Sequence, residues 1–540
     1  GLFRITPGSW KAMYRQMQEL PHARVAHTGW NAYSRIDAVE GFPAPNLARL
    51  YIDADAWTSA HLWDGRLESV ANLRDSYRAL PFKLTPGGET LIIGPGGGAD
   101  VLAALASGSR RVTAVELNPL MIRFVREYGP RAGNLYNRPD VEVVLSEGRN
   151  FISRTDRRFD VIFLGFVDTW ASVNSGGLSL SENYLYTTEA FRAYYDHLTD
   201  DGVLVILRWP TDTPRLVSNA VALLGVDEAA KRIVALTERR EGVRDNEAQM
   251  LFMLRKRPFT DAETSAIVND WTLARPMLVP GRHADPPYDD LFAGRKTLDQ
   301  YVAESPRRVG PVFDDSPFYF AVERPWGMAT RIAKALLTVV VPVLVLLGLF
   351  VMLGKPRGQP AGVYAASVGY FACLGLGFIT VELVLLQHLT LLLGHPIFTL
   401  SILLFSLLLA GGFGSAMSRH VRGRRACLIV TALGVIWAIV LPRLVPVLLP
   451  LPLAARVAIA ILIILPIGLA MGIPFPRGLR RAGRGALPAP PFYWGLNGVM
   501  SVLGSVGTVA LALMVGFQAA MLAGSGCYAL AAAFAWVIDE

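Results

Sequence analysis

The stretch Leu91-Ile-Ile-Gly94-Pro-Gly96-Gly97-Gly98-Ala99-Asp100 decides the fold of the soluble part of this 540-residue chain. An apolar strand runs into a glycine-rich turn, and a helix-length segment follows. Glycines let the backbone turn sharply and let a ligand approach without meeting a Cβ atom. The pattern therefore predicts the first strand and helix of a nucleotide-type α/β domain.

Apolar strands alternate with helix-length segments downstream of this turn. Such near-continuous apolar strands predict a parallel sheet that helices cover on both faces. The predicted strands are Leu91–Gly94, Val112–Glu116, Val141–Leu145, Phe159–Leu164 and Val203–Leu207. A helix at about Pro214–Leu224 and a strand pair ending near Gln249–Leu254 are predicted to follow.

A smaller unit precedes the sheet. Residues 11–20 predict a short helix, and Arg24–Val39 and Leu47–Asp53 alternate apolar and polar residues around a Gly/Pro turn. This alternation predicts a small β-sheet. We therefore expect three domains, over residues 1–84, 85–326 and 327–540.

The last of these domains is predicted to be a polytopic membrane domain. Between Ala329 and Ile538 the only acidic side chain is Glu382. Each of its apolar stretches is near the length of about 20 residues that crosses a bilayer. The seven stretches are 331–353, 361–382, 397–417, 426–446, 454–474, 493–515 and 517–537.

Basic connectors bear on the orientation of these stretches. Arg419–Arg425 and Arg477–Arg484 are separated by two stretches, so the positive-inside bias places both on the cytoplasmic side. Three stretches separate the first connector from the soluble domain, which is itself expected in the cytoplasm, where a nucleoside donor is found. Either one stretch does not cross the membrane or the charge bias misleads here; in the first case Val381–His395 would be re-entrant or interfacial. Glu382 is predicted to be a hydrated, interfacial residue at the end of a span.

Acidic residues after the second and third strands indicate the ligand. Glu116 ends the strand about twenty residues after the turn, where a carboxylate accepts ribose hydroxyls. A dinucleotide would use Gly94, Gly96 and Ala99 as a G-x-G-x-x-A turn. A ligand of the S-adenosylmethionine type would use Gly94, Gly96 and Gly98, together with an acid after the third strand. Glu147 fills that position and favours the sulfonium ligand.

Residues after the fourth strand are the predicted catalytic group, because catalytic side chains stand at the carboxyl ends of parallel strands. Asp168 would orient or deprotonate an acceptor, and Trp170 would wall the pocket. Tyr184 is a second candidate. Helix capping by Ser181 and packing of Tyr184 and Tyr186 on the sheet explain the same pattern equally well.

The chain resembles the spermidine synthase family, specifically its bacterial membrane-fused members. The motifs that carry the resemblance are Trp30–Asp37, Gly94–Asp100, Val115–Pro119, Asp160–Tyr186, Asp314–Phe320, Leu393–Pro396, Gly472–Pro476 and Asn497–Gly504. The resemblance implies a small β-domain before a seven-stranded methyltransferase-like, Rossmann-like sheet. It also implies decarboxylated S-adenosylmethionine as donor and aminopropyl transfer to an amine.

Three positions depart from the family pattern. Gly97 stands where soluble members carry an Asp that holds the donor's amine, and Gly165 stands where they carry the acid that acts as base. Ser34 replaces a Gln of the N-terminal sheet. A diamine needs carboxylates at both ends to offset the desolvation of its two ammonium groups. The nucleoside half of the site is therefore better supported than the polyamine half.

The leading hypothesis is a membrane-bound transferase that uses S-adenosylmethionine or its decarboxylated form. Asp168 and Tyr184 would act on the acceptor, and Gly94, Gly96, Gly98, Asp100, Glu116 and Glu147 would bind the donor. The acceptor would be a polyamine or a membrane-delivered amine. The alternatives are a non-catalytic sensor or structural subunit and a transporter regulated by the soluble domain.

Composition limits the other partners. The net charge of +8 comes largely from arginines in the membrane connectors, so nucleic acid is not expected as a partner. No metal is expected, because no Cys/His/Asp set has ligand spacing and Cys373, Cys427 and Cys527 fall in apolar segments. A homo-oligomer is compatible with the sequence. The chain starts at Gly1 without an initiator Met, so it is expected to be a fragment or a processed form.

Overall fold

The computed structural model describes residues 10–20, 22–42, 46–167, 183–239, 248–269, 274–323, 341–353, 360–394, 396–481 and 490–539. The chain divides into two compact units. The first comprises Gly1–Phe313 with Pro317–Val322, and the second comprises Asp314–Ser316 with Glu323–Glu540. The first unit covers nearly all of the first two predicted domains, and the second covers the predicted membrane domain; the three predicted boundaries stay predictions.

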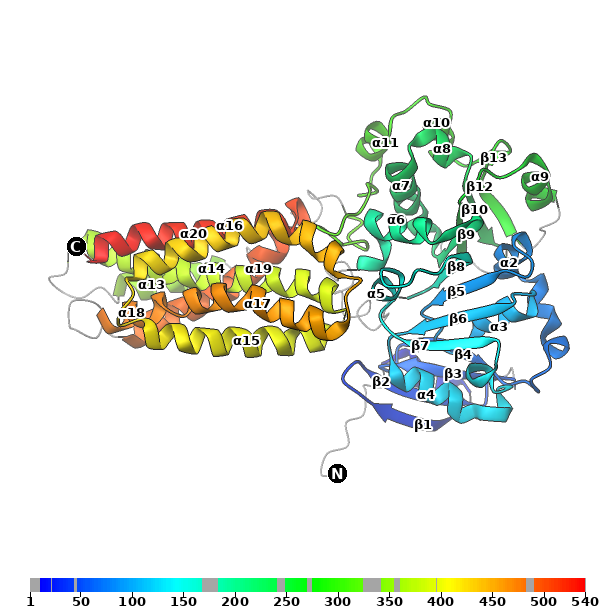
Figure 1. Ribbon diagram of the computed structural model, residues 1–540, viewed down its shortest axis with the longest axis horizontal. Helices are drawn as coiled ribbons and strands as arrows, with labels where there is room; N and C mark the ends of the chain where they lie inside the picture. The colour runs from blue at the N-terminus through cyan, green and yellow to red at the C-terminus, as the bar shows by residue number, and fades with distance from the viewer. Residues whose placement is uncertain are drawn as a thin grey trace. The chain divides into compact units, whose positions relative to one another are not determined.

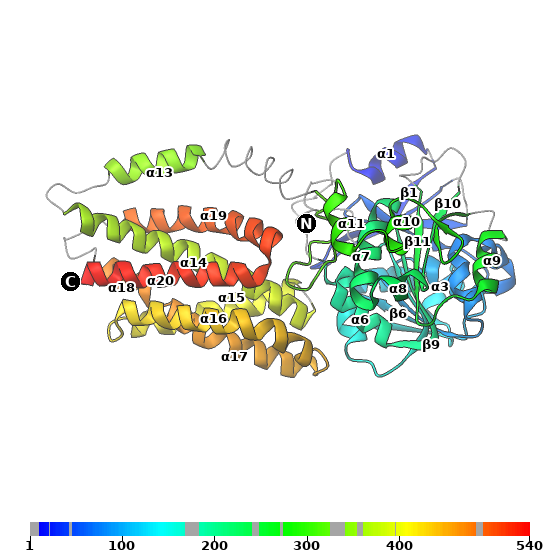
Figure 2. The same ribbon diagram turned by 90° about the horizontal axis from the view of Figure 1, so that it is seen from above.

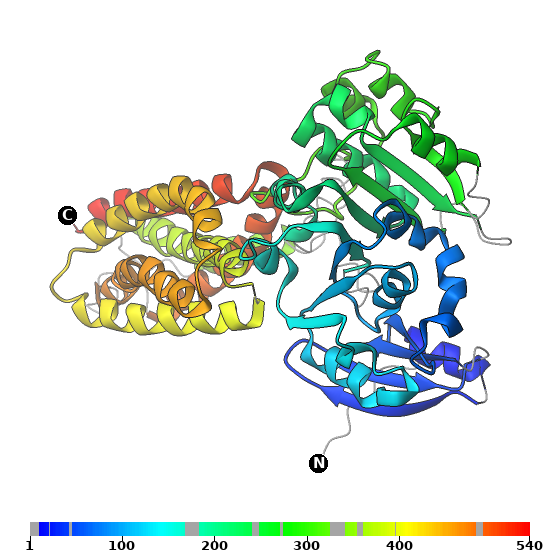
Figure 3. The same cartoon turned by 45° about the vertical axis from the view of Figure 1, so that its right-hand side comes forward.

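The first unit begins with a small antiparallel sheet in the order β1-β2-β3-β4. Its elements are α1 (Ala12–Glu19), β1 (Arg24–Trp30), β2 (Arg35–Glu40), β3 (Leu47–Ile52) and β4 (Ala56–His61). The predicted helix and β-pairing are confirmed, and β4 is an additional strand. Figures 1 and 3 show this sheet beside α4 (Pro119–Tyr128), and Gly29 of β1 lies against Phe124 of that helix.

A nine-stranded sheet is the centre of the first unit, in the order β13-β12-β10-β11-β9-β8-β5-β6-β7 (Figure 1). The strands are β5 (Glu89–Ile93), β6 (Arg111–Glu116), β7 (Val141–Leu145), β8 (Phe159–Gly165), β9 (Leu198–Arg208), β10 (Ile233–Glu238), β11 (Met250–Arg255), β12 (Ala274–Val279) and β13 (His283–Ala284). Strands β7, β6, β5, β8 and β9 pair in parallel, which confirms the five predicted strands. The implied count of seven is too low, because β12 and β13 extend the antiparallel edge beyond β10.

Helices cover both faces of this sheet, as the apolar strands predicted. Alternate strand residues point to opposite faces. Ile92 and Phe163 belong to one buried core, whereas Leu91 and Ile162 belong to the other. The remaining helices of this unit are α2 (Leu80–Leu84), α3 (Ala99–Ala106), α5 (Gly148–Ile152), α6 (Thr188–Asp196), α7 (Thr213–Leu224), α8 (Val226–Ala230), α9 (Asp261–Asn269), α10 (Tyr288–Phe292) and α11 (Leu298–Glu304).

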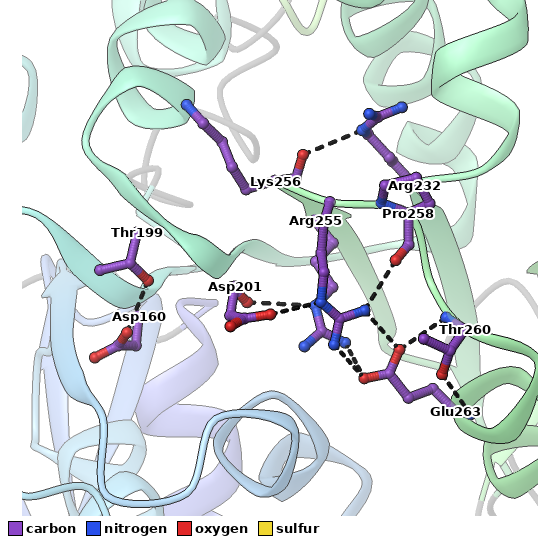
Figure 4. A network of polar contacts seen from close by, with 10 residues as sticks. Asp160, Thr199, Asp201, Arg232, Arg255, Lys256, Pro258, Thr260 and Glu263 are labelled. Carbon is purple, nitrogen blue, oxygen red and sulfur yellow. Dashed lines mark hydrogen bonds and ion pairs between the residues drawn. The ribbon is translucent and has the colours of Figure 1, made fainter.

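A network of polar and charged side chains lies at the amino ends of β8 and β9 (Figure 4). Asp160 accepts from Thr199 Oγ1 at 2.7 Å, and also from the N–H of Glu89 at the start of β5, at 2.8 Å. Glu263 of α9 accepts from Arg255 at 2.6 Å and from Arg257 at 2.8 Å. These bonds tie α9 and β11 together at the edge of the sheet where the parallel strands begin.

The second unit is a bundle of long apolar helices, seen from two sides in Figures 1 and 2. Its helices are α13 (Val341–Leu353), α14 (Ala361–Leu393), α15 (Pro396–Met417), α16 (Gly423–Leu448), α17 (Leu453–Met471), α18 (Pro474–Arg481), α19 (Pro490–Val515) and α20 (Phe517–Asp539). Six helices of the described residues are long and apolar enough to cross a membrane. They correspond to six of the seven predicted stretches, and residues 331–340 of the remaining one lie outside the described residues.

Of the two alternatives predicted for Val381–His395, the re-entrant one is wrong, and the interfacial one stays a prediction. Helix α14 runs without a break over 33 residues to Leu393. At 1.5 Å per residue this helix is about 50 Å long, well over the thickness of the hydrocarbon core. Glu382 is therefore inside a helix rather than at the end of one. The apolar residues that follow Glu382 continue the helical pattern, and Gly394 in the left-handed conformation ends it.

The tripeptide Asp314–Ser316 belongs to the helical unit because it binds the turn between α19 and α20. The Asp315 carboxylate accepts from the N–H of Gln518 at 2.8 Å, and its carbonyl accepts from the N–H of Phe517 at 2.8 Å. The side chain thus satisfies an N–H of the first turn of α20, as an N-cap residue does. Burial raises the pKa of this carboxyl, although the bond from Gln518 opposes the rise.

Candidate functional site

The strand order brings the predicted ligand-binding segments to one edge of the sheet. Strands β8, β5, β6 and β7 are consecutive neighbours, and all four run in parallel. The glycine-rich turn follows β5, Glu116 ends β6, Glu147 follows β7 and Gly165 ends β8. In parallel sheets this carboxyl edge is where ligands bind.

The glycine-rich turn has the backbone that only glycine adopts without strain. Gly94, Gly96 and Gly98 have φ angles of +70°, +53° and +89°. Protein atoms also approach these positions closely: a Cβ on Gly94 would lie 2.4 Å from Cγ1 of Val167, and one on Gly96 would lie 2.8 Å from Oγ1 of Thr58. Both the conformation and the packing therefore require glycine here.

Glu116 joins the two halves of the predicted nucleoside site. Its carboxylate accepts from the N–H of Gly96 at 3.2 Å and from the N–H of Asn118 at 2.9 Å. The residue is 8% exposed, and burial raises its pKa while these backbone bonds oppose the rise. A carboxylate in this position is held against the turn, with its desolvation offset only in part.

Glu147 has a structural role in addition to the predicted one. Its carboxylate accepts from the N–H groups of Arg149 and Asn150, at 2.9 and 2.8 Å, and from the side-chain amide of Asn150 at 3.1 Å. It is therefore the N-cap of α5. Its contact with an adenine amino group stays a prediction.

Asp100 takes part in an ion pair inside the first unit. Arg78 donates from Nη1 to its carboxylate at 3.0 Å and from Nη2 to Oε1 of Gln249 at 2.6 Å. The Asp100 side chain is 12% exposed. A Cβ on Gly165 would lie 2.5 Å from Oδ2 of Asp100. The carboxylate of Asp100 thus occupies the space that a side chain at position 165 would enter.

The other departure from the family pattern also has a steric cause. A Cβ on Gly97 would lie 2.3 Å from the carbonyl oxygen of Ser59 in β4. The N–H of Gly97 donates to Oγ1 of Thr58 at 3.1 Å. Since the main chain of β4 fills this space, an acid at position 97 would displace the small sheet from the turn.

The small sheet contacts the site at a second place. Asn118, the N-cap of α4, accepts from Asn31 at 2.7 Å and donates to Oγ of Ser34 at 2.9 Å. The Ser34 that replaces the family's Gln therefore anchors the loop that follows Glu116. The amide of Asn118 thereby joins the N-terminal sheet to the carboxyl edge.

The predicted catalytic residues are described in part. Asp168, Trp170 and Ser181 lie outside the described residues. Tyr184 begins a 3-10 helix (Tyr184–Tyr186) that Asn183 caps, and it is half-buried. Tyr186 is buried with its ring centroid 4.6 Å from that of Tyr319, so packing explains this tyrosine.

Sequence reasoning did not identify four residues near the turn: Thr58, His61, Arg78 and Tyr136. The hydroxyl of Tyr136 donates to the carbonyl of Gly96 at 2.6 Å. His61 ends β4, and its Nδ1 is buried without a hydrogen-bond partner among the described residues. Burial and the charge of Arg78 lower its pKa, against the opposing effect of Asp100. Thr58 and His61 lie on β4, a strand that the sequence pattern did not predict.

The described residues contain no group of three or more His, Cys, Asp or Glu side chains that could hold a metal ion. Arg149 and Arg208 are the buried cations nearest in sequence to the ends of β7 and β9. Arg208 donates to Asp212 at 2.8 Å. The polar groups near this edge are carboxylates, guanidinium groups, hydroxyls, the Asn118 amide and the His61 imidazole, which suit an organic ligand.

Known proteins resemble the same region. Residues 80–214 match the family model of the "Spermine/spermidine synthase domain". The "Polyamine aminopropyltransferase" of Thermotoga maritima is 28% identical over 182 residues, which are 33% of this chain and 56% of that protein. The protein of the same name from Thermotoga petrophila is 30% identical over 116 residues, which are 21% of this chain and 36% of that protein. The chain thus spans about a third to just over half of the length of these relatives.

Two solved structures are also similar. A spermidine synthase from Thermotoga maritima has 17% identity and a TM-score of 0.33, over 52% of this chain and 86% of that one. A probable spermidine synthase from Corynebacterium glutamicum has 17% identity and a TM-score of 0.34, over 48% of this chain and 96% of that one.

Proposed function

We propose that residues 80–214, a spermine/spermidine synthase domain, bind decarboxylated S-adenosylmethionine and transfer its aminopropyl group to an amine. The observation that carries the proposal is the contact of the Glu116 carboxylate with the glycine-rich turn at adjacent strand ends. This pairing of a glycine turn with an acid suits an adenosine ligand. The names of the curated relatives support the aminopropyl group over a methyl group from S-adenosylmethionine itself.

The chemistry asks little of the protein. The acceptor nitrogen attacks the carbon beside the sulfonium, a C–N bond forms, and the C–S bond breaks to leave a neutral thioether. The sulfonium is already activated, so the protein must position the two reactants and remove one proton from the amine. No metal or further cofactor is needed for this balance.

The donor would lie along the ends of β5, β6 and β7. The turn at Gly94, Gly96 and Gly98 would accommodate the chain beside the sulfonium, and Glu116 would accept the ribose hydroxyls. Glu147 would face the adenine amino group while it caps α5. Asp100 would act on the donor's amine from within its ion pair with Arg78, rather than as an isolated carboxylate.

The acceptor side differs from the family pattern at Gly165, which carries no acid. The carboxylate of Asp100 stands beside the position of the acid that the family uses as base. We propose that Asp168 and Tyr184 orient the acceptor and that His61, whose lowered pKa keeps the imidazole neutral near pH 7, takes its proton. With Arg78 beside Asp100, the site suits an amine with one cationic centre better than a diamine.

The helical unit indicates a membrane location, which limits the possible sources of the acceptor. Six of its described helices could cross a bilayer, so we propose an inner-membrane protein with its first unit on the cytoplasmic side, where the donor is made. The acceptor is then a polyamine or an amine delivered by the membrane. Homo-oligomerisation is compatible with this arrangement.

Calorimetric titration of the detergent-solubilised full chain with each donor tests the proposal. Decarboxylated S-adenosylmethionine should bind, and Glu116→Ala should abolish binding. Glu142→Ala is the matched control, because this acid lies on neighbouring β7 in half-exposed ion pairs with Arg111 and Arg157. If neither donor binds the unmodified chain, the proposal is wrong.

A non-catalytic subunit that keeps the nucleoside site is the second candidate. The filled spaces at Gly97 and Gly165 favour it, because both family acids are absent there. Incubation of the chain with the bound donor and a panel of monoamines and diamines separates the two functions. Formation of the thioether product supports the transferase, and donor binding without product supports the subunit.

A further inference from the structure

A cavity of about 500 Å³ lies at one end of the helical unit. Four arginines line it: Arg419, Arg477, Arg480 and Arg481. Tyr370 and Phe371 of α14 form an aromatic wall. The cavity does not belong to the site proposed above, because all these residues are in the second unit.

The arginines come from two connectors that are far apart in the sequence. Arg419 follows the end of α15 at Met417, and the other three lie on the short helix α18. Ile538, in the last turn of α20, lines the same cavity, and Figure 2 shows α18 beside that end of α20. Both basic connectors therefore lie at the same end of the helical unit, and the side of the membrane stays a prediction.

Hydrogen bonds hold two of the guanidinium groups in place. Arg480 donates from Nη2 to Oγ of Ser418 at 2.7 Å, and Arg477 donates from Nη1 to the carbonyl of Ser418 at 3.3 Å. The Nε of Arg477 is buried and has no hydrogen-bond partner among the described residues. One N–H of this planar group therefore remains for a ligand.

Helix α18 is fixed against α14, so the cavity is a built feature of the bundle. The Tyr370 hydroxyl donates to the carbonyl of Pro474 at 2.8 Å. A Cβ on Gly478 would lie 2.8 Å from both the Tyr370 and the Phe371 ring. This close packing sets the distance between the aromatic wall and the arginines that follow Gly478.

The charge of the cavity's described lining favours an anion. Its described lining contains four guanidinium groups and no carboxylate. Like charges around one cavity repel each other, and a bound anion relieves this repulsion. Phosphate matches the planar fork of arginine in a bidentate fashion, so a phosphate group suits this cluster better than a halide or a single carboxylate.

We propose that this cavity binds the phosphate group of an anionic lipid headgroup. The cavity lies at the ends of helices that are long and apolar enough to cross a bilayer, which is the level of the headgroups. Basic pockets between membrane helices take anionic headgroups. Ala535 and Ile538 give the cavity an apolar border for the start of an acyl chain.

Native mass spectrometry and thermal unfolding of the detergent-solubilised full chain test this proposal. The probes are phosphatidylglycerol, phosphatidylcholine and inorganic phosphate. Phosphatidylglycerol should be retained and should raise the melting temperature, and phosphatidylcholine should do neither. Stabilisation by inorganic phosphate alone, with no retained lipid, would show that free phosphate is the ligand and would overturn the lipid assignment.

The double variant Arg477→Gln/Arg480→Gln should bind phosphatidylglycerol at least tenfold more weakly, which corresponds to about 1.4 kcal/mol. Arg443→Gln is the matched control, because this exposed arginine of α16 donates to its own helix at Ile439 and lies outside the cavity. It should leave lipid binding unchanged. Equal retention of lipid by the double variant and by the control would overturn the proposal.

Two further variants keep the test decisive if the double variant fails to fold. Arg419→Gln lies in an exposed connector and should reduce lipid binding without altering the helical content. Asp539 and Glu540 follow Ile538 in the sequence, so their neutralisation by Asp539→Asn/Glu540→Gln should leave binding as tight or tighter. Loss of lipid binding in the latter variant would contradict an anion site.

Discussion

At the amino edge of the nine-stranded sheet, Glu263 accepts hydrogen bonds from two arginines and a main-chain N–H group. At the carboxyl edge, Glu116 is bonded by main-chain N–H groups of Gly96 and Asn118. Burial opposes ionisation of Glu263, but the bonds from Arg257 and Thr260 and the charge of Arg255 outweigh it and lower its pKa to about 2. Burial instead raises the pKa of Glu116.

The difference between the two edges indicates which one is built for stability and which for a ligand. A carboxylate saturated by cations contributes to folding and has little capacity left for a ligand (Figure 4). A buried carboxylate that lacks a cation costs stability, and such a cost is typical of functional sites. At the carboxyl edge, Glu116 therefore has no cation as a partner among the described residues, and Asp100 is in an ion pair that a ligand could rearrange.

Removal of Arg78 should cause the largest loss of folding stability among the variants considered. Arg78→Met leaves the mostly buried carboxylate of Asp100 without its cation, and breaking a buried pair in this way costs about 3 kcal/mol or more. Arg110→Met at the amino edge is the control, because its pair with Glu89 is exposed and such pairs contribute up to about 1 kcal/mol. Thermal unfolding of the full chain should show a clear loss for Arg78→Met. Equal melting temperatures of the two variants would contradict a structural ion pair at the site.

Exchange of the two glutamates should separate binding from folding. Glu116→Gln removes the charge that we propose accepts the ribose hydroxyls, and charged hydrogen bonds of this kind contribute about 1.5–3 kcal/mol, so donor affinity should fall roughly 10- to 100-fold. Glu263→Gln should lower the melting temperature and leave the affinity unchanged. Calorimetric titration and thermal unfolding of both variants measure the two effects. A loss of affinity in Glu263→Gln would show that the edges are not independent.

The carboxyl edge was predictable from the sequence where it depends on strand periodicity. The apolar runs and the glycine turn located β5 to β9, Glu116 and Glu147 correctly, because local patterns specify strands and their ends. The ion pair of Asp100 with Arg78 was not predictable, since the two residues meet only after the segment that follows β4 packs on α3. The re-entrant alternative for Val381–His395 was wrong because a single Glu382 does not interrupt a helix that apolar residues continue on both sides.

Substitutions at position 165 test whether the Asp100 carboxylate occupies the space beside Gly165. Gly165→Asp alone places a second carboxylate within contact of Asp100, and steric and charge repulsion should destabilise the chain by about 1–3 kcal/mol. Gly165→Asp combined with Asp100→Ala removes that clash and restores the acid at the position where the family carries it. The double variant should melt at a higher temperature than the single variant, because its one remaining carboxylate then stands beside Arg78 without a second one in contact. If the two variants melt alike, Asp100 does not occupy the space beside Gly165.

Acid titration should give the smallest effect and the clearest sign. The folded pKa of Glu263 is about 2, below its ordinary value of 4.5, so its contribution to stability is complete above about pH 5 and is lost as the pH falls toward 2. The pKa shift of Glu116 has the opposite direction. Because its pKa is raised in the folded chain, its protonation begins at a higher pH than is usual for a glutamate. As the pH is lowered, donor affinity should therefore fall first. The stabilisation by Glu263, measured as the difference in melting temperature between the unmodified chain and Glu263→Gln, should be lost at a lower pH. Both curves can be measured on the full chain between pH 3 and pH 7, and their coincidence would mean that one group controls both edges.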